Sequence, residues 1–206
     1  LEGGQLHIGE HGEGLFRGPN VMAGYWNNEE ATAAAIDSDG WLHTGDAGYV
    51  DVDGFLVITD RIKDIIVTLG GKNVAPQPIE GLILADPLFE HAVLLGDNRP
   101  CVTLLVKPSL PHVEELGKLM QWPGEVADWL KSNELAEELR RRVTALTDKL
   151  PSQEKPRATE LMDDDLTTDN GLLTPTLKVR RRQVEERFKE LIDGMYEALE
   201  RRRRSN

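Results

Sequence analysis

Two short apolar runs in the middle of the chain constrain its fold most strongly. Residues 92–95 (Ala-Val-Leu-Leu) and 101–106 (Cys-Val-Thr-Leu-Leu-Val) have the length of strands and carry no charged side chain. Successive side chains of a strand point to opposite faces of its sheet, so a continuous apolar run is buried on both faces. A sheet made of such strands needs cover on each face, which predicts an α/β architecture.

Helical segments surround these strands in the sequence. A short helix is predicted to open at Pro76, because proline is favoured in the first helical turn. Residues 111–149 are predicted to be mainly helical with a break at Pro123, and residues 150–178 to be mostly loop. Apolar side chains recur at helical spacing over residues 184–199, which predicts one long final helix.

The first sixty residues are predicted to be mostly β. Residues 6–8 and 15–17 are interpreted as short strands, and Asn27 is predicted to cap a short helix. An Asp-Gly pair at 53–54 separates two β-prone runs, which predicts a hairpin whose two turn residues both adopt positive φ. These residues do not make a convincing core and are interpreted as the edge of something larger.

The segment from residue 61 onward is predicted to form a small α/β (α+β) domain. Residues 61–68 are expected to continue as a strand, and Gly70 and Gly71 to make a second tight turn. The order of strands and helices along the chain predicts a hairpin and a small mixed sheet flanked by helices. The predicted division is therefore residues 1–60 as a β-rich remnant of a larger domain and residues 61–206 as a small domain.

Composition excludes several classes of protein. The formal net charge of −12 argues against general nucleic-acid binding. The four arginines at 201–204 are interpreted as a solvated helix end, with binding to RNA or anionic lipid as the alternative. A single cysteine, Cys101, excludes a disulfide framework and fits a reducing cytoplasm. No apolar run reaches the ~18 residues of a membrane span, and the first residues do not resemble a signal peptide.

Three polar segments stand out together, although each alone has a structural explanation. They are residues 41–46 (Trp-Leu-His-Thr-Gly-Asp), residues 60–74 (Asp-Arg-Ile-Lys-Asp-Ile-Ile, continuing to Gly-Gly-Lys-Asn-Val) and residues 170–181 (Asn-Gly-Leu-Leu-Thr-Pro-Thr-Leu-Lys-Val-Arg-Arg). The glycine pair in the second segment is not a Walker A loop, because the preceding glycine and the Ser or Thr of that motif are missing. The scattered histidines and the single cysteine give no zinc-type cluster.

In this order and at this spacing, the three segments resemble motifs of the adenylate-forming superfamily. That superfamily includes acyl-CoA synthetases, luciferases and nonribosomal adenylation domains. Residues 12–26 also resemble a preceding motif, so the resemblance spans roughly residues 12–190. The Asn-Gly-Leu-Leu-Thr-Pro-Thr-Leu-Lys stretch is similar to the long-chain fatty acyl subgroup, whereas most members carry Ser-Gly-Lys and here Leu177 replaces that glycine.

The resemblance implies roles for seven positions. Asp46 and Arg61 would hold the ribose hydroxyls of ATP or AMP, as acceptor and as planar donor. Lys63 would be the hinge about which a mobile small domain swivels. Lys178 would be the catalytic lysine that stabilises charge during adenylation.

After the swivel, the resemblance implies that another face of the small domain meets the acyl-adenylate. The turn at Gly70 and Gly71 would let backbone approach the CoA side of the site, because glycine has no side chain. Lys72 would contact a phosphate of the nucleotide or of CoA; an exposed turn lysine is the alternative.

The implied reaction converts a fatty acid, ATP and CoA to acyl-CoA, AMP and pyrophosphate. The phosphate loop, the adenine-binding segment, the Mg²⁺ ligands and the fatty-acid tunnel of the family would lie in a missing N-terminal domain. The protein is therefore expected to be a cytoplasmic acid-thiol ligase whose present segment is inactive alone. Peripheral membrane contact and homo-oligomerisation stay open. Delivery of the acyl group to a carrier protein, and a non-catalytic lid module, are the alternative functions.

Overall fold

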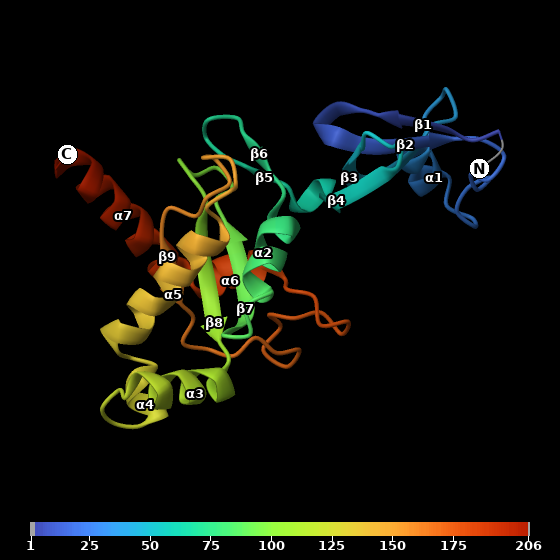
Figure 1. Cartoon of the computed structure of the whole chain (residues 1–206). Helices are drawn as coiled ribbons and strands as arrows, with labels where there is room; N and C mark the ends of the chain where they lie inside the picture. Colours follow the sequence, from blue (N-terminus) through green and yellow to red (C-terminus); the bar gives the residue numbers. More distant parts are fainter. Residues whose placement is uncertain (1–2, 206) are drawn as a thin grey trace. The chain divides into compact units, whose positions relative to one another are not determined.

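The computed structural model describes residues 3–205, and the chain forms two compact units, Leu1–Ile65 and Ile66–Asn206. The first is built on one antiparallel sheet, and the second on a three-stranded mixed sheet with helices on both faces (Figure 1). The α/β class predicted from the sequence is confirmed.

The first unit is an antiparallel meander of four strands in sequential order. The strands are β1 (Gln5–Ile8), β2 (Glu13–Arg17), β3 (Leu42–Val50) and β4 (Leu56–Arg61). Three short helices complete it: η1 (Glu10–Gly12), α1 (Glu29–Ala35) and η2 (Ile62–Asp64). The strands predicted near residues 6–8 and 15–17 are confirmed as β1 and β2.

Two local predictions for this unit are wrong in detail. The cap of α1 is Asn28, whose side-chain oxygen accepts a hydrogen bond of 2.9 Å from the Ala31 amide. The β3–β4 connection is longer than two residues: the Asp51 amide donates to the Phe55 carbonyl, and the Asp51 carboxylate accepts from the amides of Asp53 and Phe55. Of the Asp-Gly pair only Gly54 has a positive φ, of 85°, because the aspartate side chain organises the turn.

The first unit has almost no core of its own. Among its described residues only Gly14, Ala47 and Asp60 are buried. Large apolar side chains stand in solvent instead, including Trp26, which is 92% exposed, and Phe55, which is 69% exposed. An apolar surface of this kind is typical of a face that another part of a protein covers.

The second unit opens with a short hairpin, β5 (Ile66–Val67) and β6 (Asn73–Val74). Its sheet contains β7 (Phe89–Leu95), β8 (Thr103–Pro108) and β9 (Thr159–Leu161), with β7 antiparallel and β9 parallel to β8. The helices of the unit, in chain order, are α2 (Pro76–Leu84), α3 (Leu110–Met120), α4 (Val126–Trp129), α5 (Asn133–Leu146), α6 (Arg181–Arg187) and α7 (Lys189–Ser205).

The two apolar runs are the central strands, and they are buried on both faces as predicted. Leu94 and Leu104 point into a cluster with α2, α3, α4 and α5. Their neighbours Val93 and Leu105 point into a second cluster with α6, α7 and the segment before α6. Because successive side chains of a strand point to opposite faces, each strand contributes residues to both clusters.

Three element predictions for this unit fail. Residues 61–68 do not continue as one strand, because η2 forms where the Ile65 amide donates back to the carbonyls of Arg61 and Ile62. The final helix is divided between α6 and α7 at Phe188. Strand β9 lies within the predicted loop, and its three residues pair with β8.

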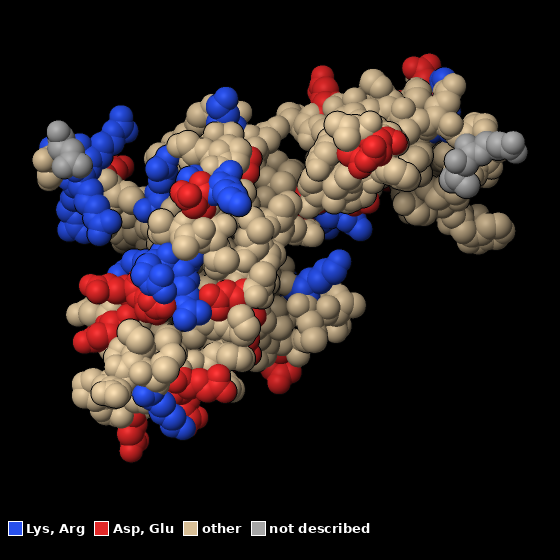
Figure 2. All heavy atoms as spheres, in the orientation of Figure 1, with Lys and Arg blue, Asp and Glu red and all other residues tan. Residues whose placement is uncertain are grey.

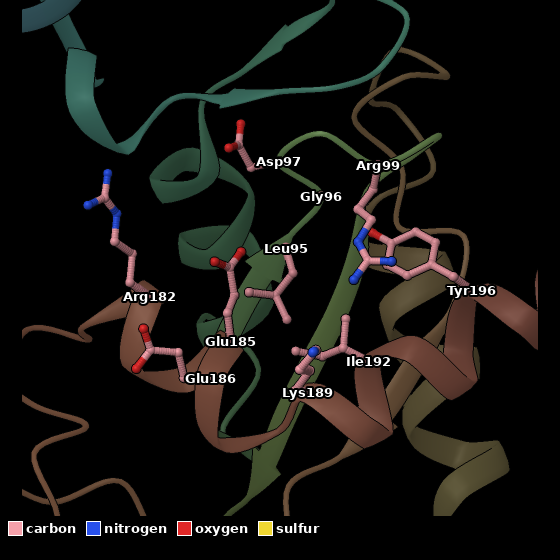
Figure 3. Close-up of a pocket in the computed structure, with 10 residues that line it drawn as sticks. All are labelled: Leu95, Gly96, Asp97, Arg99, Arg182, Glu185, Glu186, Lys189, Ile192 and Tyr196. Carbon is pink, nitrogen blue, oxygen red and sulfur yellow. The ribbon is translucent and has the colours of Figure 1, made fainter.

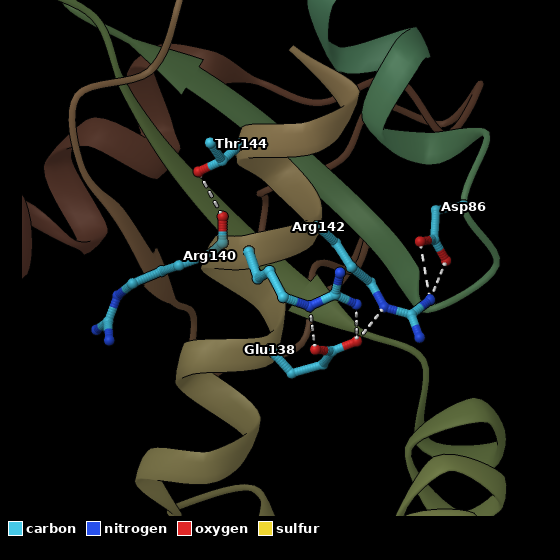
Figure 4. A network of polar contacts seen from close by, with 6 residues as sticks. Asp86, Glu138, Arg140, Arg142 and Thr144 are labelled. Atoms are coloured by element: carbon cyan, nitrogen blue, oxygen red, sulfur yellow. Dashed lines mark hydrogen bonds and ion pairs between the residues drawn. The ribbon is translucent and has the colours of Figure 1, made fainter. Parts of the chain in front are cut away.

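An ion network fastens α5 to the turn after α2 (Figure 4). The Glu138 carboxylate accepts hydrogen bonds of 2.7 Å from Arg141 and 2.8 Å from Arg142. Arg142 also donates to the Asp86 carboxylate at 2.9 Å. The hydrogen bond from Arg141 is the main cause that lowers the pKa of Glu138 to about 2, and Arg142 adds to it.

Candidate functional site

Asp46 and Arg61 are brought together in the first unit. They are register partners across β3 and β4, and the Arg61 Nε lies 2.8 Å from the Asp46 Oδ1. A register shift between Ala47 and Gly48 bends the strand beside them. The Asp46 side chain is 33% exposed and the Arg61 side chain 55% exposed, so both retain polar atoms that face solvent.

A set of polar contacts holds the β3 segment that carries Asp46. Glu13 on β2 accepts from the Gly45 amide at 2.9 Å and lies 3.1 Å from His43 Nδ1. The Thr44 hydroxyl donates to the Gly14 carbonyl at 2.7 Å and accepts from the Asp46 amide. The position of Asp46 is thus fixed through β2, and sequence reasoning found no role for Glu13 because it lies far away along the chain.

The loop before β3 is organised by Asp37. Its carboxylate accepts from the amides of Trp41 and Asp39, and the first of these hydrogen bonds is the main cause that lowers its pKa. The Arg17 guanidinium lies over the Trp41 ring, with the arginine Cζ 4.6 Å from the ring centroid. These contacts define where the polar segment 41–46 enters the sheet.

Lys63, the predicted hinge, is exposed in η2. It follows β4 directly and precedes the boundary between the two units, which falls after Ile65. Nothing in its surroundings fixes its side chain: within residues 3–205 it makes no hydrogen bond or ion pair.

Gly70, Gly71 and Lys72 lie on the exposed connection between β5 and β6. The Gly71 amide donates to the Thr68 carbonyl at 2.8 Å, and Gly71 adopts a φ of 70° that favours glycine. The Thr68 amide donates to the Lys72 carbonyl at 3.0 Å, which closes the turn. The predicted tight turn is confirmed, and Gly70, Gly71 and Lys72 are all exposed on it.

Lys178 lies in a second tight turn, which a β-bridge between Leu173 and Val179 closes. The Thr174 hydroxyl accepts from the Lys178 amide at 3.0 Å, and the Thr174 amide donates to the Lys178 carbonyl at 2.8 Å. The lysine side chain is exposed and has no bonding partner in the described part of the chain. Its backbone is therefore held while its ammonium group remains available.

Leu177, directly before this lysine, adopts a left-handed conformation with a φ of 58°. Glycine reaches this region freely, whereas a residue with a Cβ is strained there. The leucine side chain is 72% exposed, so packing does not compensate for the strain. The backbone thus explains why glycine suits this position in the motif that most adenylate-forming proteins carry.

The stretch before the lysine turn is tied down by Asn170. Its side-chain oxygen accepts from the amides of Thr167 and Leu172, and its amide nitrogen donates to the Asp165 carbonyl at 2.7 Å. Leu172 and Leu173 are buried in the second core cluster. In the Asn-Gly-Leu-Leu sequence, the asparagine thus holds the loop by hydrogen bonds and the two leucines anchor it in the core.

Arg181 anchors the other end of the turn, and sequence reasoning missed this. Its guanidinium donates to the Glu80 carboxylate at 2.7 Å and to the Leu94 carbonyl at 3.0 Å. Glu80 also accepts from the Leu94 amide at 2.7 Å. Both side chains are largely buried, and their positions in the chain are too far apart for a local pattern to reveal the pair.

A cavity of about 390 Å³ lies between the β7–β8 turn and helices α6 and α7 (Figure 3). Charged side chains of both signs line it: Arg99, Arg182, Lys189, Asp97, Glu185 and Glu186. Arg99 stacks over the Tyr196 ring at 4.8 Å and pairs with Asp193 at 2.6 Å. Burial raises the pKa of Tyr196 to about 12. The cationic and anionic side chains of the lining are equal in number, and no predicted site residue lines the cavity.

The predicted site residues are divided between the two units. Asp46, Arg61 and Lys63 lie in the first unit, whereas Gly70, Gly71, Lys72 and Lys178 lie in the second. Within the second unit, the β5–β6 turn and the loop that carries Lys178 lie at different ends (Figure 1). Over residues 3–205, no three His, Cys, Asp or Glu side chains are arranged to hold a metal ion. No helix in the same range has the length and apolar character to cross a bilayer.

Comparison with known proteins points to one family. The model of the AMP-binding enzyme C-terminal domain matches residues 63–200. The long-chain-fatty-acid–CoA ligase FadD15 of Mycobacterium tuberculosis is 41% identical over 199 residues, which cover 95% of this chain and 33% of that protein. The chain thus spans about a third of the length of this curated relative.

Solved structures of adenylation domains have the same fold. The A domain of carboxylic acid reductase from Segniliparus rugosus, in complex with AMP and a co-purified carboxylic acid, matches with a TM-score of 0.70 and 25% identity over 91% of this chain and 28% of that one. The A-PCP didomain of the same reductase, in complex with AMP, matches with a TM-score of 0.68 and 25% identity over 94% of this chain and 26% of that one. Through residues 63–200, this chain belongs to the family of AMP-binding enzyme C-terminal domains.

Proposed function

We propose that this chain is the C-terminal part of an ATP-dependent long-chain fatty acyl-CoA synthetase. The whole enzyme would join a fatty acid to AMP with release of pyrophosphate, and then transfer the acyl group to the thiol of CoA. The identity with a long-chain fatty-acid ligase over nearly the whole chain supports this reaction. The observation that carries the proposal is the exposed ammonium group of Lys178 on a turn with a fixed backbone.

Lys178 would act in the first half-reaction. A carboxylate oxygen of the fatty acid attacks the α-phosphorus, and the bond to pyrophosphate breaks as the new bond forms. Negative charge grows on the phosphoryl oxygens and the leaving group, where a lysine ammonium stabilises it. The two anchored ends of the turn support this role, because a stabilising group must reach the same place in each cycle.

Asp46 and Arg61 would bind the ribose of the nucleotide. A carboxylate accepts hydrogen bonds from both hydroxyls of a diol, and the guanidinium is a planar donor. Their mutual ion pair supports this role, because it orients each group before the sugar arrives. Lys72, Gly70 and Gly71 would meet the phosphates and the thiol of CoA in the second half-reaction.

Residues 1–60 would belong to the larger adenylating domain, and residues 61–206 would be the mobile lid. The exposed apolar side chains of the first unit support the idea that more of the protein covers it. Lys63 would be the hinge, which its place in η2 just before the unit boundary supports. The Mg²⁺ that accompanies ATP is assigned to the remainder of the protein. The proposed location is the cytoplasm, where ATP and CoA would be available to such a ligase.

The test is a half-reaction comparison in the full-length enzyme. Lys178→Ala is expected to lower the rate of acyl-AMP formation by about 10²–10³. Thioester formation from supplied acyl-AMP should change little, because after the swivel another face of the small domain, without Lys178, would meet the acyl-adenylate. Lys149→Ala is the matched control, since Lys149 is also exposed and makes no bond among residues 3–205. Unchanged adenylation in Lys178→Ala would refute the role.

A second candidate is transfer of the acyl group to a carrier-protein thiol. The similarity to a solved A-PCP didomain favours it. Parallel assays with CoA and with a phosphopantetheinylated carrier protein as acceptor separate the two. Faster transfer to CoA would support the synthetase. Faster transfer to the carrier protein would instead support the second candidate function.

A further inference from the structure

A groove of about 260 Å³ lies between helix α5, strand β9 and helix α7. Three arginines line it, one from each side: Arg140 from α5, Arg157 from the segment before β9, and Arg202 from α7. Figure 2 shows basic side chains gathered at the C-terminal end of α7 and beside α5. Such a cluster stands out in a chain whose formal net charge is −12.

The buried face of α7 leads directly into this groove. Met195, Ala198, Leu199 and Arg202 line it at the spacing of one helical face. The first three supply apolar surface, and the fourth brings a guanidinium over the same surface. Arg202 makes no hydrogen bond or ion pair in the described part of the chain. Its position on the packed face, and not on the outer face, points its charge toward the groove.

The other two arginines are only partly satisfied. Arg157 donates to the carbonyl and hydroxyl of Ser152, at 3.1 and 2.7 Å, and has no carboxylate partner within residues 3–205. Arg140 pairs with Glu160 at 3.0 Å, and its side chain is 45% exposed. Figure 4 shows that Arg140 points away from the network that binds Arg142 to Asp86.

The charge of the groove therefore matches one class of ligand. Its lining holds three arginines and one glutamate, a formal excess of two positive charges. A phosphate monoester carries about −1.5 to −2 charges at neutral pH, and arginine binds its oxygens with paired donors. The lining of the groove also includes the apolar side chains of Val143, Ala158 and Leu199.

We propose that the groove formed by Arg140, Arg157 and Arg202 is a binding site for the phosphate monoester of an organic ligand. It is separate from the loop that carries Lys178, since that loop and the C-terminal end of α7 lie on opposite sides of the second unit (Figure 1). The ligand is thus not the nucleotide under attack, and the site goes beyond the proposed reaction. Two sources present this chemistry: a soluble phosphate ester, and the headgroup of phosphatidic acid in a membrane.

The experiment measures binding of the 206-residue chain to each source. Isothermal titration with glycerol 3-phosphate tests the soluble ester. Flotation with phosphatidylcholine vesicles that contain phosphatidic acid tests the lipid, and phosphatidylglycerol, whose phosphodiester has a single charge, is the lipid control. Binding is expected in one of the first two arms, and it should weaken below about pH 6 as the monoester gains a proton.

Two charge-matched variants make the test specific. Arg140→Gln/Arg157→Gln/Arg202→Gln empties the groove of its cations, whereas Arg201→Gln/Arg203→Gln/Arg204→Gln removes the same charge from arginines that do not line it. The first is expected to weaken binding at least about tenfold and the second less than about twofold. Since Arg140 and Arg157 also bond to the fold, Arg202→Gln alone is measured with a thermal melt, and it should weaken binding without changing the melt.

Three outcomes would overturn the proposal. Equal loss in the two triple variants would show that only overall charge attracts the ligand. Equal binding to phosphatidylglycerol vesicles would show that a monoester is not recognised. No binding of either glycerol 3-phosphate or phosphatidic acid vesicles would leave the groove without the ligand class assigned to it.

Discussion

Asp46 and Arg61 face each other across adjacent strands, with 2.8 Å between the carboxylate Oδ1 and the guanidinium Nε. Fifteen positions of chain separate them, yet the β3–β4 hairpin makes them register partners. The pair is partly exposed, so its contribution to folding is small, roughly 0–1 kcal/mol. The proposed nucleotide-binding role of the pair can therefore be tested with little effect on stability.

Replacing Asp46 by Asn in the full-length enzyme should raise KM for ATP about tenfold or more, because charge-assisted bonds to the ribose are lost. The thermal midpoint should move little. Asp39→Asn is the control, since that side chain is exposed in the same unit and makes no side-chain bond over residues 3–205. An unchanged KM for ATP in Asp46→Asn would remove the pair from the nucleotide site.

Leu177 should tolerate glycine better than a β-branched residue. At a φ of 58°, Leu177→Gly relieves the strain of the left-handed conformation, and the gain partly offsets the greater freedom of glycine in the unfolded chain. Leu177→Val should destabilise the chain by about 1 kcal/mol or more, because a branched Cβ fits this region poorly. Urea unfolding measures the stability of both variants. A valine variant as stable as the glycine variant would show that the backbone at this position is not strained.

At acid pH, Glu138 should no longer contribute to the stability of the fold. Its folded pKa, about 2, lies below the ordinary value of 4.5, so the folded state binds fewer protons. The contribution is complete above about pH 4.5 and is lost as the pH falls toward 2. Glu138→Gln should therefore be less stable than the wild type by about 1–2 kcal/mol at pH 7, and the difference should shrink toward pH 2.

Denaturant unfolding at a series of pH values measures this difference. Glu137→Gln is the control, because Glu137 is exposed on the same helix and has no partner in the described residues. A Glu138→Gln deficit that stays constant from pH 7 to the acid end would show that packing, and not the carboxylate charge, is responsible.

Two helical glycines should respond oppositely to alanine. A Cβ at Gly117 in α3 would lie 2.3 Å from the Trp129 ring, so Gly117→Ala must displace the ring or the helix. It should destabilise the chain by about 1–3 kcal/mol. A Cβ at Gly81 in α2 meets no atom within 4 Å, so Gly81→Ala should stabilise by about 0.5–1 kcal/mol. Thermal melts compare them; two shifts of equal sign and size would show that the α3–α4 packing is not as close as described.

Local pattern determined much of this protein. The apolar runs at 92–95 and 101–106 specified strands buried on both faces, because alternation along a strand is a property of its own residues. The Gly70–Gly71 turn and the ordered polar motifs were visible for the same reason. The sequence also showed Lys178 and its preceding Asn-Gly-Leu-Leu stretch.

Tertiary structure decided what distant residues do to one another. The ion pair between Glu80 and Arg181, the support of Asp46 by Glu13, and the addition of β9 to the sheet all join segments far apart in the chain. So does the arginine groove, whose three cations come from different elements. No short-range periodicity encodes such pairings, because they depend on how buried faces pack and which strands become neighbours.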